Sequence, residues 1–344
     1  MDLKQNNQSI ELHKGTISIS LVNEVISSVK DAHCDIHAIL HQSGIPLELL
    51  NAPKARISIE SFGRLWIELA NQLNDEFFGM DRHPMRRGSF KLLSEMLIHS
   101  ENLRKAIQHI TQFFNSVLDD VQSQLFVQEN YAYIVIKDLN GTKPMFSYAT
   151  YIMLIHSLMC WLSGQRVILN QIQLKCPAPL DDQDYKVRFC EQIKYGCDEH
   201  YIQFDANYLN IAIKQDRQSW SNFIKQTPYN LLVRYKNPNS ISTIIRKQLI
   251  NSSPSEWLEI HDLAKQLNLS EATFQRRLKA EAVSYQQLKN DIRRDIAIEL
   301  LTQTDYSLQQ ISDELDFHDP SAFHRAFKKW TGVSPGAYRH LQEH

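Results

Sequence analysis

Two stretches near the end of this 344-residue chain repeat one another, and the repeat limits what the chain can fold into. They are LAKQLNLSEATFQRRLK (263–279) and ISDELDFHDPSAFHRAFK (311–328), aligned at an offset of 48 residues before one inserted residue and 49 after it. Each copy predicts a short helix, a tight turn and a second helix, which is the pattern of a helix-turn-helix motif. The matched positions are Leu263 with Ile311, Leu267 with Leu315, Leu269 with Phe317, Phe274 with Phe323, Arg276 with Arg325, and Lys279 with Lys328.

The turn between the two helices of each copy carries Asn268 or Asp316, where glycine is the commonest residue of such turns. Asn and Asp are the residues other than glycine that best tolerate a left-handed backbone. We therefore expect both turns to form without glycine.

The segment between the copies, YQQLKNDIRRDIAIELLTQ (285–303), predicts one amphipathic helix, with an apolar stripe made of Leu288, Ile292, Ile296 and Leu300. A helix of this length spans roughly 28 Å, and successive major grooves on one face of DNA are about 34 Å apart. A rigid connector of this size would hold two recognition helices in neighbouring grooves. The competing interpretation is a plain helical bundle whose Arg and Lys side chains are merely solvated.

The net charge does not by itself support DNA binding. The whole chain carries −2, and the part from residue 251 to the end has 11 Lys and Arg against 14 Asp and Glu, a net −3. A nucleic-acid interface here has to rest on where the cations lie rather than on bulk basicity.

The residues before the repeat show both helical and strand periodicity, which predicts an α+β domain. Helices are expected over 17–50, from about 58 onward, and over 91–98, 103–118 and 147–162; strands are expected over 124–128, 131–137, 167–174 and 201–204. The stretch YKNPNS (235–240) is typical of a linker, and only helices are predicted beyond it. The predicted organisation is an α+β domain over 1–235, then an all-α domain over 236–344 with two helix-turn-helix motifs joined by a linker helix.

Several classes of protein find no support in the sequence. The polar N-terminus MDLKQNNQSI lacks a signal-peptide pattern, and the longest apolar run, 151–162, is too short to cross a membrane, so a cytoplasmic protein is expected. The five cysteines contain no CxxC pair, which fits reduced thiols. No glycine-rich phosphate loop, HExxH or GxSxG motif is present, so we predict neither an enzyme nor a cofactor.

A metal site is one interpretation of Cys34, His37 and His41, whose spacing would place them on one helix face, with His33 beside them. Such a site needs three or four ligands that converge on one point. We favour a helix with a few partly exposed polar residues, and predict no metal.

The last hundred residues resemble the DNA-binding domain of AraC-type transcription regulators. The resemblance rests on SEATFQRRLKAEAVSYQQL (270–288), on Arg293, and most specifically on SAFHRAFKKWTGVSPGAYR (321–339). The N-terminal part is similar to the arabinose-binding-type sensor domain of one subgroup, through SGIP, FGRLWIELANQL, DEFFGM and VRFCEQIKYGC. Ala272 and Ala282 depart from the family's pattern, which often has a cation at the first position and usually glycine at the second.

The resemblance implies a transcription regulator, expected to be an activator, whose sensor domain over 1–235 binds an unidentified small-molecule effector and pairs into a homodimer. Double-stranded promoter DNA and RNA polymerase are the other implied partners. A ligand-independent DNA-binding protein, regulated by its abundance or by a partner, is the alternative. The aromatic residues that either line an effector pocket or form plain core are Phe77, Phe78, Phe113, Phe114, Tyr148, Tyr151 and Trp161.

The expected DNA contacts lie on the outward faces of the second helix of each copy. They are Ala272, Gln275, Arg276 and Lys279 in the first copy, and Ser321, His324, Arg325, Lys328 and Lys329 in the second. Arg pairs bidentately with guanine and Gln with adenine, so Arg276, Gln275 and Arg325 are expected to read bases. The lysines are expected to meet phosphates, and His324 is left with either role. Near Ser307, a predicted helix N-terminus is expected to hold a phosphate through its backbone N–H groups.

Overall fold

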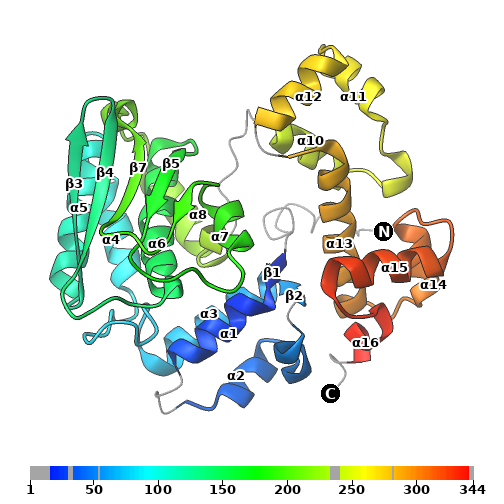
Figure 1. Ribbon diagram of the computed structural model, residues 1–344, viewed down its shortest axis with the longest axis horizontal. Helices are drawn as coiled ribbons and strands as arrows, with labels where there is room; N and C mark the ends of the chain where they lie inside the picture. Colours follow the sequence, from blue (N-terminus) through cyan, green and yellow to red (C-terminus); the bar gives the residue numbers. More distant parts are fainter. Residues whose placement is uncertain (1–15, 30–33, 53–54, 233–240, 281–282, 341–344) are drawn as a thin grey trace. The chain divides into compact units, whose positions relative to one another are not determined.

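The computed structural model describes residues 16–29, 34–52, 55–232, 241–280 and 283–340, and the chain divides into two compact units (Figure 1). The C-terminal unit combines the described residues of 236–344 with those of 1–19 and 44–61. The N-terminal unit combines the described residues of 20–43 with those of 62–235. The linker expected at 235–240 lies outside the described residues, and the domain bounds 1–235 and 236–344 stay a prediction.

The N-terminal unit contains a five-stranded sheet whose spatial order is β3 (Val121–Gln128), β4 (Tyr131–Asp138), β7 (His200–Asp205), β5 (Leu169–Gln173) and β6 (Ile193–Lys194). Neighbouring strands are antiparallel except β5 and β6, which are parallel. The predicted hairpin is the β3–β4 pair, which turns at Glu129 with a left-handed φ of 52°. Alternate residues of β4 (Ala132, Ile134 and Ile136) are buried, so one face of the sheet forms core.

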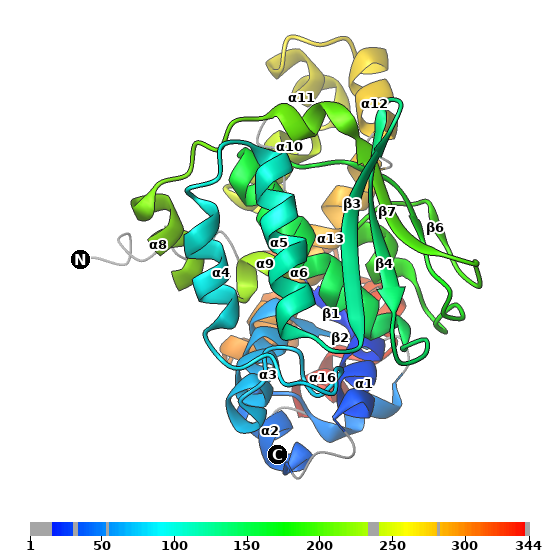
Figure 2. The same ribbon diagram turned by 90° about the vertical axis from the view of Figure 1, so that its left-hand side faces the viewer.

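Helix α5 packs against β3, and α6 packs against α5 (Figure 2). The helices of the N-terminal unit are α1 (Ile19–Ser28), α2 (Ile36–Gln42), α3 (Ile59–Leu73), α4 (Ser89–Leu97), α5 (Leu103–Val117), α6 (Met145–Ser163), α7 (Gln183–Arg188), α8 (Arg217–Lys225) and α9 (Tyr229–Leu232), with a 3₁₀ turn η3 (Ala206–Asn210). Among the described residues only α6 is long and apolar enough to cross a membrane, and its whole apolar window is buried inside the unit. This matches the buried helix expected from the sequence.

The segment 17–50, expected to be helical, is helical in α1 and α2 but begins with a short strand and ends in a 3₁₀ turn. The chain forms β1 (Thr16–Ser18), then α1 and α2, and then a 3₁₀ turn η2 (Leu47–Asn51). The break before α2 has a local cause, since the Asp35 side chain accepts a hydrogen bond from the Ala38 N–H at 3.0 Å and starts a new helix. Pro46 then sits in extended backbone at the N-cap of η2.

The C-terminal unit is built on the predicted linker helix. Its helices are α10 (Ile241–Ile250), η4 (Pro254–Glu256), α11 (Ile260–Gln266), α12 (Glu271–Ala280), α13 (Tyr285–Gln303), α14 (Leu308–Glu314), α15 (Pro320–Thr331) and α16 (Pro335–His340). Helix α13 has the bounds expected for the connector, and Figure 1 shows α11–α12 at one end of it and α14–α15 at the other. The two helix-turn-helix motifs are therefore held apart by one helix.

A short antiparallel ribbon, β1 with β2 (Arg56–Ser58), belongs to the C-terminal unit although it lies near the start of the sequence. The Arg56 guanidinium ties the two strands together, since Nε donates to Thr16 Oγ1 at 2.9 Å and Nη2 donates to the Thr16 carbonyl at 2.8 Å. The strand β2 packs against α13. From α16, the buried Tyr338 hydroxyl donates to the Arg56 carbonyl at 2.8 Å.

Candidate DNA-binding surface

The two turns have the same backbone geometry. Asn268 and Asp316 have φ of 55° and 57°, as expected for residues that stand in for glycine. One residue later, the Leu269 N–H donates to the Ala264 carbonyl at 2.9 Å and the Phe317 N–H donates to the Ser312 carbonyl at 3.0 Å. These bonds close both motifs at the offset of 48 residues that the sequence repeat predicted.

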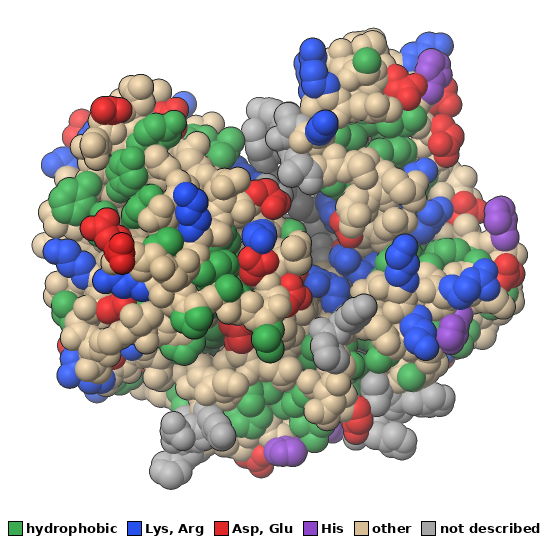
Figure 3. Space-filling view, in the orientation of Figure 1, with side chains coloured by type: hydrophobic (Ala, Val, Ile, Leu, Met, Phe, Trp, Pro, Cys, Tyr) green, Lys and Arg blue, Asp and Glu red, His purple; other side chains and the backbone are tan. Residues whose placement is uncertain are grey.

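The second helix of each motif buries one face and exposes the other. Phe274 and Leu278 of α12 are buried, as are Phe323 and Phe327 of α15, because apolar residues four apart lie on one helix face. All the predicted contact residues on these helices are exposed: Ala272, Gln275, Arg276, Lys279, Ser321, His324, Arg325, Lys328 and Lys329. Figure 3 shows Lys and Arg side chains over α12 and over α15. Both helices can therefore serve as recognition helices.

Among the described residues, the cations of this surface form no direct ion pair with an acidic side chain, whereas many acids of the unit are engaged internally. Asp291 and Asp295 lie near Arg246 and Arg294 in a cluster with N···O distances of 3.1 to 4.0 Å. The Asp319 carboxylate caps α15 by accepting from the Ala322 N–H at 2.7 Å. That bond lowers the pKa of Asp319, and the nearby Arg325 charge lowers it further. The net −3 is thus compatible with an outward-facing cationic surface.

Ser307 is exposed and caps α14, but its own backbone N–H is already engaged. That N–H donates to Gln310 Oε1 at 2.8 Å, and the Gln310 N–H donates to the Ser307 hydroxyl at 3.2 Å. This reciprocal capping box leaves the Ser307 N–H with an internal partner. A phosphate bound here would have to use other N–H groups of the same turn or the Ser307 hydroxyl.

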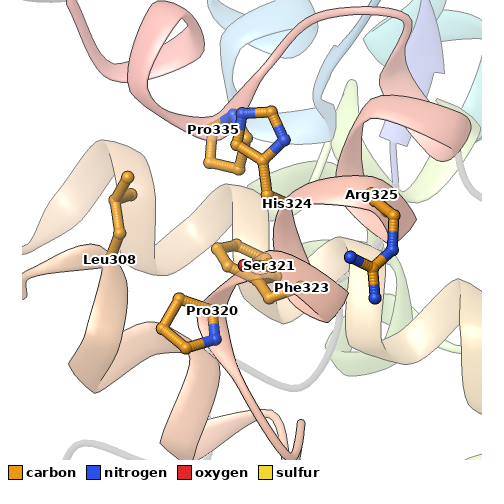
Figure 4. A pocket seen from close by; sticks show the side chains of 7 residues that line it. All are labelled: Leu308, Pro320, Ser321, Phe323, His324, Arg325 and Pro335. Atoms are coloured by element: carbon orange, nitrogen blue, oxygen red, sulfur yellow. The ribbon is translucent and has the colours of Figure 1, made fainter.

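A surface pocket of about 320 Å³ lies beside the second recognition helix (Figure 4). Its lining combines apolar side chains with polar and basic ones: Leu308, Pro320, Ser321, Phe323, His324, Arg325 and Pro335. Sequence analysis found three of these as DNA contacts but missed Leu308, Pro320 and Pro335, because they come from three different helices. Apolar and basic side chains side by side suit a thymine methyl next to a phosphate.

Most of the aromatic residues that were candidates for an effector pocket are core residues of the N-terminal unit, whereas Phe113 is half-buried. Phe77, Phe78, Phe114 and Tyr151 are fully buried, and Trp161 stacks on Phe223 with ring centroids 4.4 Å apart. Within the described part of the chain there is no group of three or more His, Cys, Asp or Glu side chains placed to hold a metal ion, and His33 lies outside that part.

A buried polar network lies beneath the sheet of the N-terminal unit. Tyr148 donates to the Asp138 carboxylate at 2.8 Å, and His200 Nε2 lies 2.8 Å from Asp138 Oδ2. The Lys175 N–H donates to His200 Nδ1 at 3.2 Å, so the ring carries its proton on Nε2 and donates to Asp138. Burial lowers the pKa of His200, and the Asp138 carboxylate opposes this shift.

Two exposed recognition helices on one connector, attached to an α+β unit, define a double helix-turn-helix DNA-binding protein. A model of the arabinose-binding domain of AraC transcription regulators, N-terminal, matches residues 34–213, and a helix-turn-helix domain model matches residues 263–340. The chain belongs to the AraC family of transcription regulators with an arabinose-binding-type N-terminal domain. Members of this family combine an N-terminal ligand-binding domain with a helix-turn-helix DNA-binding domain.

Similar curated proteins are regulators of the same kind. The ornithine utilization regulator of Pseudomonas aeruginosa is 22% identical over 94% of this chain and 96% of its own length. The urease operon transcriptional activator of Escherichia coli is 34% identical over 26% of this chain and 31% of its own. A crystal structure of the regulator CdpR from Pseudomonas aeruginosa covers 73% of this chain and 81% of its own at 18% identity, with a TM-score of 0.28 that is too low for a fold comparison.

Proposed function

We propose that this chain activates transcription by placing α12 and α15 in two neighbouring major grooves of promoter DNA. The observation that carries the proposal is the pair of exposed helices whose cations have no ion-pair partner among the described residues, held at opposite ends of α13. Arg276, Gln275 and Arg325 read bases, and Lys279, Lys328 and Lys329 hold phosphates. Ala272, Ser321 and His324 lie against the same groove walls.

The proposal extends to partners and location. The domain over 1–235 binds a small-molecule effector and supports a homodimer, and the domain over 236–344 contacts RNA polymerase when it is bound at a promoter. The protein acts in the cytoplasm and is not an enzyme. Support comes from the family and from relatives named as activators.

A salt series on the full-length protein tests the DNA-binding surface. The probe is a duplex enriched by the protein from a randomised pool, and binding is measured by gel shift between roughly 50 and 200 mM salt. The logarithm of the association constant is expected to fall steeply with the logarithm of salt concentration, by about 0.9 for each phosphate contact. A flat response would favour a helical bundle whose cations are merely solvated.

Thermal unfolding of the full-length protein with candidate metabolites tests the effector. A ligand that binds only the folded protein raises the melting temperature by mass action. The name of the ornithine utilization regulator makes ornithine the first compound to add, with other amino acids beside it. If no compound shifts the melting temperature or the DNA affinity, the ligand-independent alternative gains support.

A further inference from the structure

Arg293 occupies the middle of the connector α13 and reaches the turn of the second motif. Its Nε donates to the Leu315 carbonyl at 3.0 Å, and its Nη2 lies 3.6 Å from the Asp316 carboxylate. Leu315 is fully buried, and Asp316 is the left-handed residue of the turn. A guanidinium fixes a carbonyl and a carboxylate in a defined direction because its donors form a rigid planar fork.

The same guanidinium also lies over two aromatic rings, one from each side of α13 in the sequence. Its central carbon lies 5.1 Å from the centre of the Trp257 ring and 5.7 Å from the centre of the Phe317 ring. Trp257 belongs to the buried cluster beneath the first motif, together with Phe274 of α12. Its indole N–H donates to the Leu249 carbonyl at the end of α10 at 2.9 Å, so the ring is fixed in place.

From Phe317 the contact continues to the second recognition helix. The Phe317 ring lies 5.8 Å from the Phe323 ring and 6.1 Å from the Trp330 ring, both on α15. Only 18% of the Arg293 side chain is exposed, so its contacts are shielded from competing water. One side chain therefore touches the core under the first recognition helix and the turn that carries the second.

We propose that Arg293 is the positioning residue that sets the mutual orientation of the two recognition helices, so that both enter their grooves at once. The proposal rests on the proposed two-groove DNA binding and adds the residue that makes it cooperative. When one helix is bound, a rigid connection presents the other to its groove at a high effective concentration, which multiplies the affinity of the whole. A flexible connection would keep the DNA contacts of each helix but would lose this gain in affinity.

Lys289, one helical turn earlier on α13, provides a matched control. Its ammonium lies 3.5 Å from the Glu259 carboxylate and 4.9 Å from the centre of the Tyr285 ring. Its side chain is 12% exposed, close to the value for Arg293, but both of these partners precede Lys289 in the sequence and neither belongs to the second motif. Lys289→Met removes a shielded cation from α13 without breaking a contact that joins the first motif to the second.

The test compares full-length wild-type protein, Arg293→Met and Lys289→Met on duplexes derived from the enriched probe. One duplex is intact, one has the first half-site scrambled, one has the second half-site scrambled, and one has half a helical turn, roughly 5 base pairs, inserted between the half-sites. Arg293→Met is expected to weaken binding to the intact duplex about tenfold while leaving binding to each single half-site within about twofold. It is also expected to lose less affinity than wild type on the duplex with the insertion.

Two results would overturn the role of Arg293. One is an equal loss on all the duplexes, which marks a residue that only holds the fold. The other is wild-type affinity with wild-type sensitivity to the insertion. Wild-type protein that is indifferent to scrambling either half-site would instead refute two-groove binding itself. If Arg293→Met does not fold, as judged by circular dichroism, Arg293→Lys carries the test, because it keeps the cation and loses the fork; it is expected to tolerate the insertion better than wild type.

Discussion

At the scale of single residues, the two recognition helices differ although their backbones match. Gln275 and His324 occupy equivalent positions, but the Gln275 amide donates to Glu271 Oε1 at 3.1 Å, whereas His324 borders the pocket. The first helix therefore presents a carboxamide already oriented by its own helix, and the second presents an imidazole beside a partly apolar pocket. We expect the second helix to supply more of the affinity.

Arg325 is the residue through which this expectation is tested. Arg325→Ala would remove the proposed bidentate base contact and is expected to weaken specific binding by about 1–3 kcal/mol. Gel-shift titration at one fixed salt concentration measures the change. The control is Arg217→Ala, since the Arg217 side chain is 85% exposed in the N-terminal unit. Equal affinity of Arg325→Ala and wild type would remove Arg325 from the list of base contacts.

His200 gives the N-terminal unit a defined dependence on pH. Burial holds the folded pKa of His200 below its usual 6.5, so the unfolded chain binds more protons once the pH falls below that value. The free energy of unfolding is therefore expected to have its full value above about pH 6.5 and to decrease as the pH falls below 6.5. Urea unfolding at pH 7.5 and at pH 5.5 measures the difference.

The variant His200→Gln is expected to reduce the difference in the free energy of unfolding between the two pH values. Exposed His83→Gln, in the same unit, is the control and is expected to leave it unchanged. If His200→Gln keeps the full wild-type pH dependence, another group is responsible for it.

At the scale of elements, regular periodicity made most of the C-terminal unit predictable. The connector, the two turns and the outward faces followed from apolar residues at helical spacing and from one internal repeat, since burial of one face fixes the other. The pocket and the Arg293 contacts were not predictable. They depend on how separate helices pack together, and the local sequence around Leu308 or Pro335 does not indicate this packing.

The left-handed turns provide the prediction at this scale. Asn268→Ala keeps a side chain at φ 55° but loses the tolerance of asparagine for this conformation, so it is expected to lower stability by about 1 kcal/mol. Asn268→Gly relieves the strain at an entropic cost and is expected to stay within about 0.5 kcal/mol of wild type. Urea unfolding compares the three proteins. Equal stability of the alanine and glycine variants would show that the turn is not strained.

At the scale of the whole molecule, residues that are far apart in the sequence belong to the same compact unit. The ribbon β1–β2 belongs with helices that begin after residue 240, and no pattern in the sequence predicted this. A three-residue strand has no periodicity to detect, and the hydrogen bond that joins Tyr338 to Arg56 spans 282 residues. The compact C-terminal unit therefore includes residues from two separate parts of the sequence.

Tyr338→Phe tests how much the ribbon contributes. The substitution keeps the ring against Phe327, at a centroid distance of 5.5 Å, and deletes only the buried donor to the Arg56 carbonyl. Stability of the full chain is expected to fall by about 1–3 kcal/mol. Tyr306→Phe is the control, because the Tyr306 side chain is exposed in the same unit. Thermal and urea unfolding of both variants give the comparison, and equal stability would show that the ribbon is only loosely held.

The bond between Tyr338 and Arg56 also sets an order of events during synthesis. At about 5–20 residues per second, roughly 15 to 60 s separate the emergence of Arg56 from that of Tyr338 on the ribosome. During that interval the Arg56 carbonyl lacks the Tyr338 hydroxyl as its donor. A nascent chain arrested before α16 would therefore have the strand β2 without the buried hydrogen bond that joins it to α16.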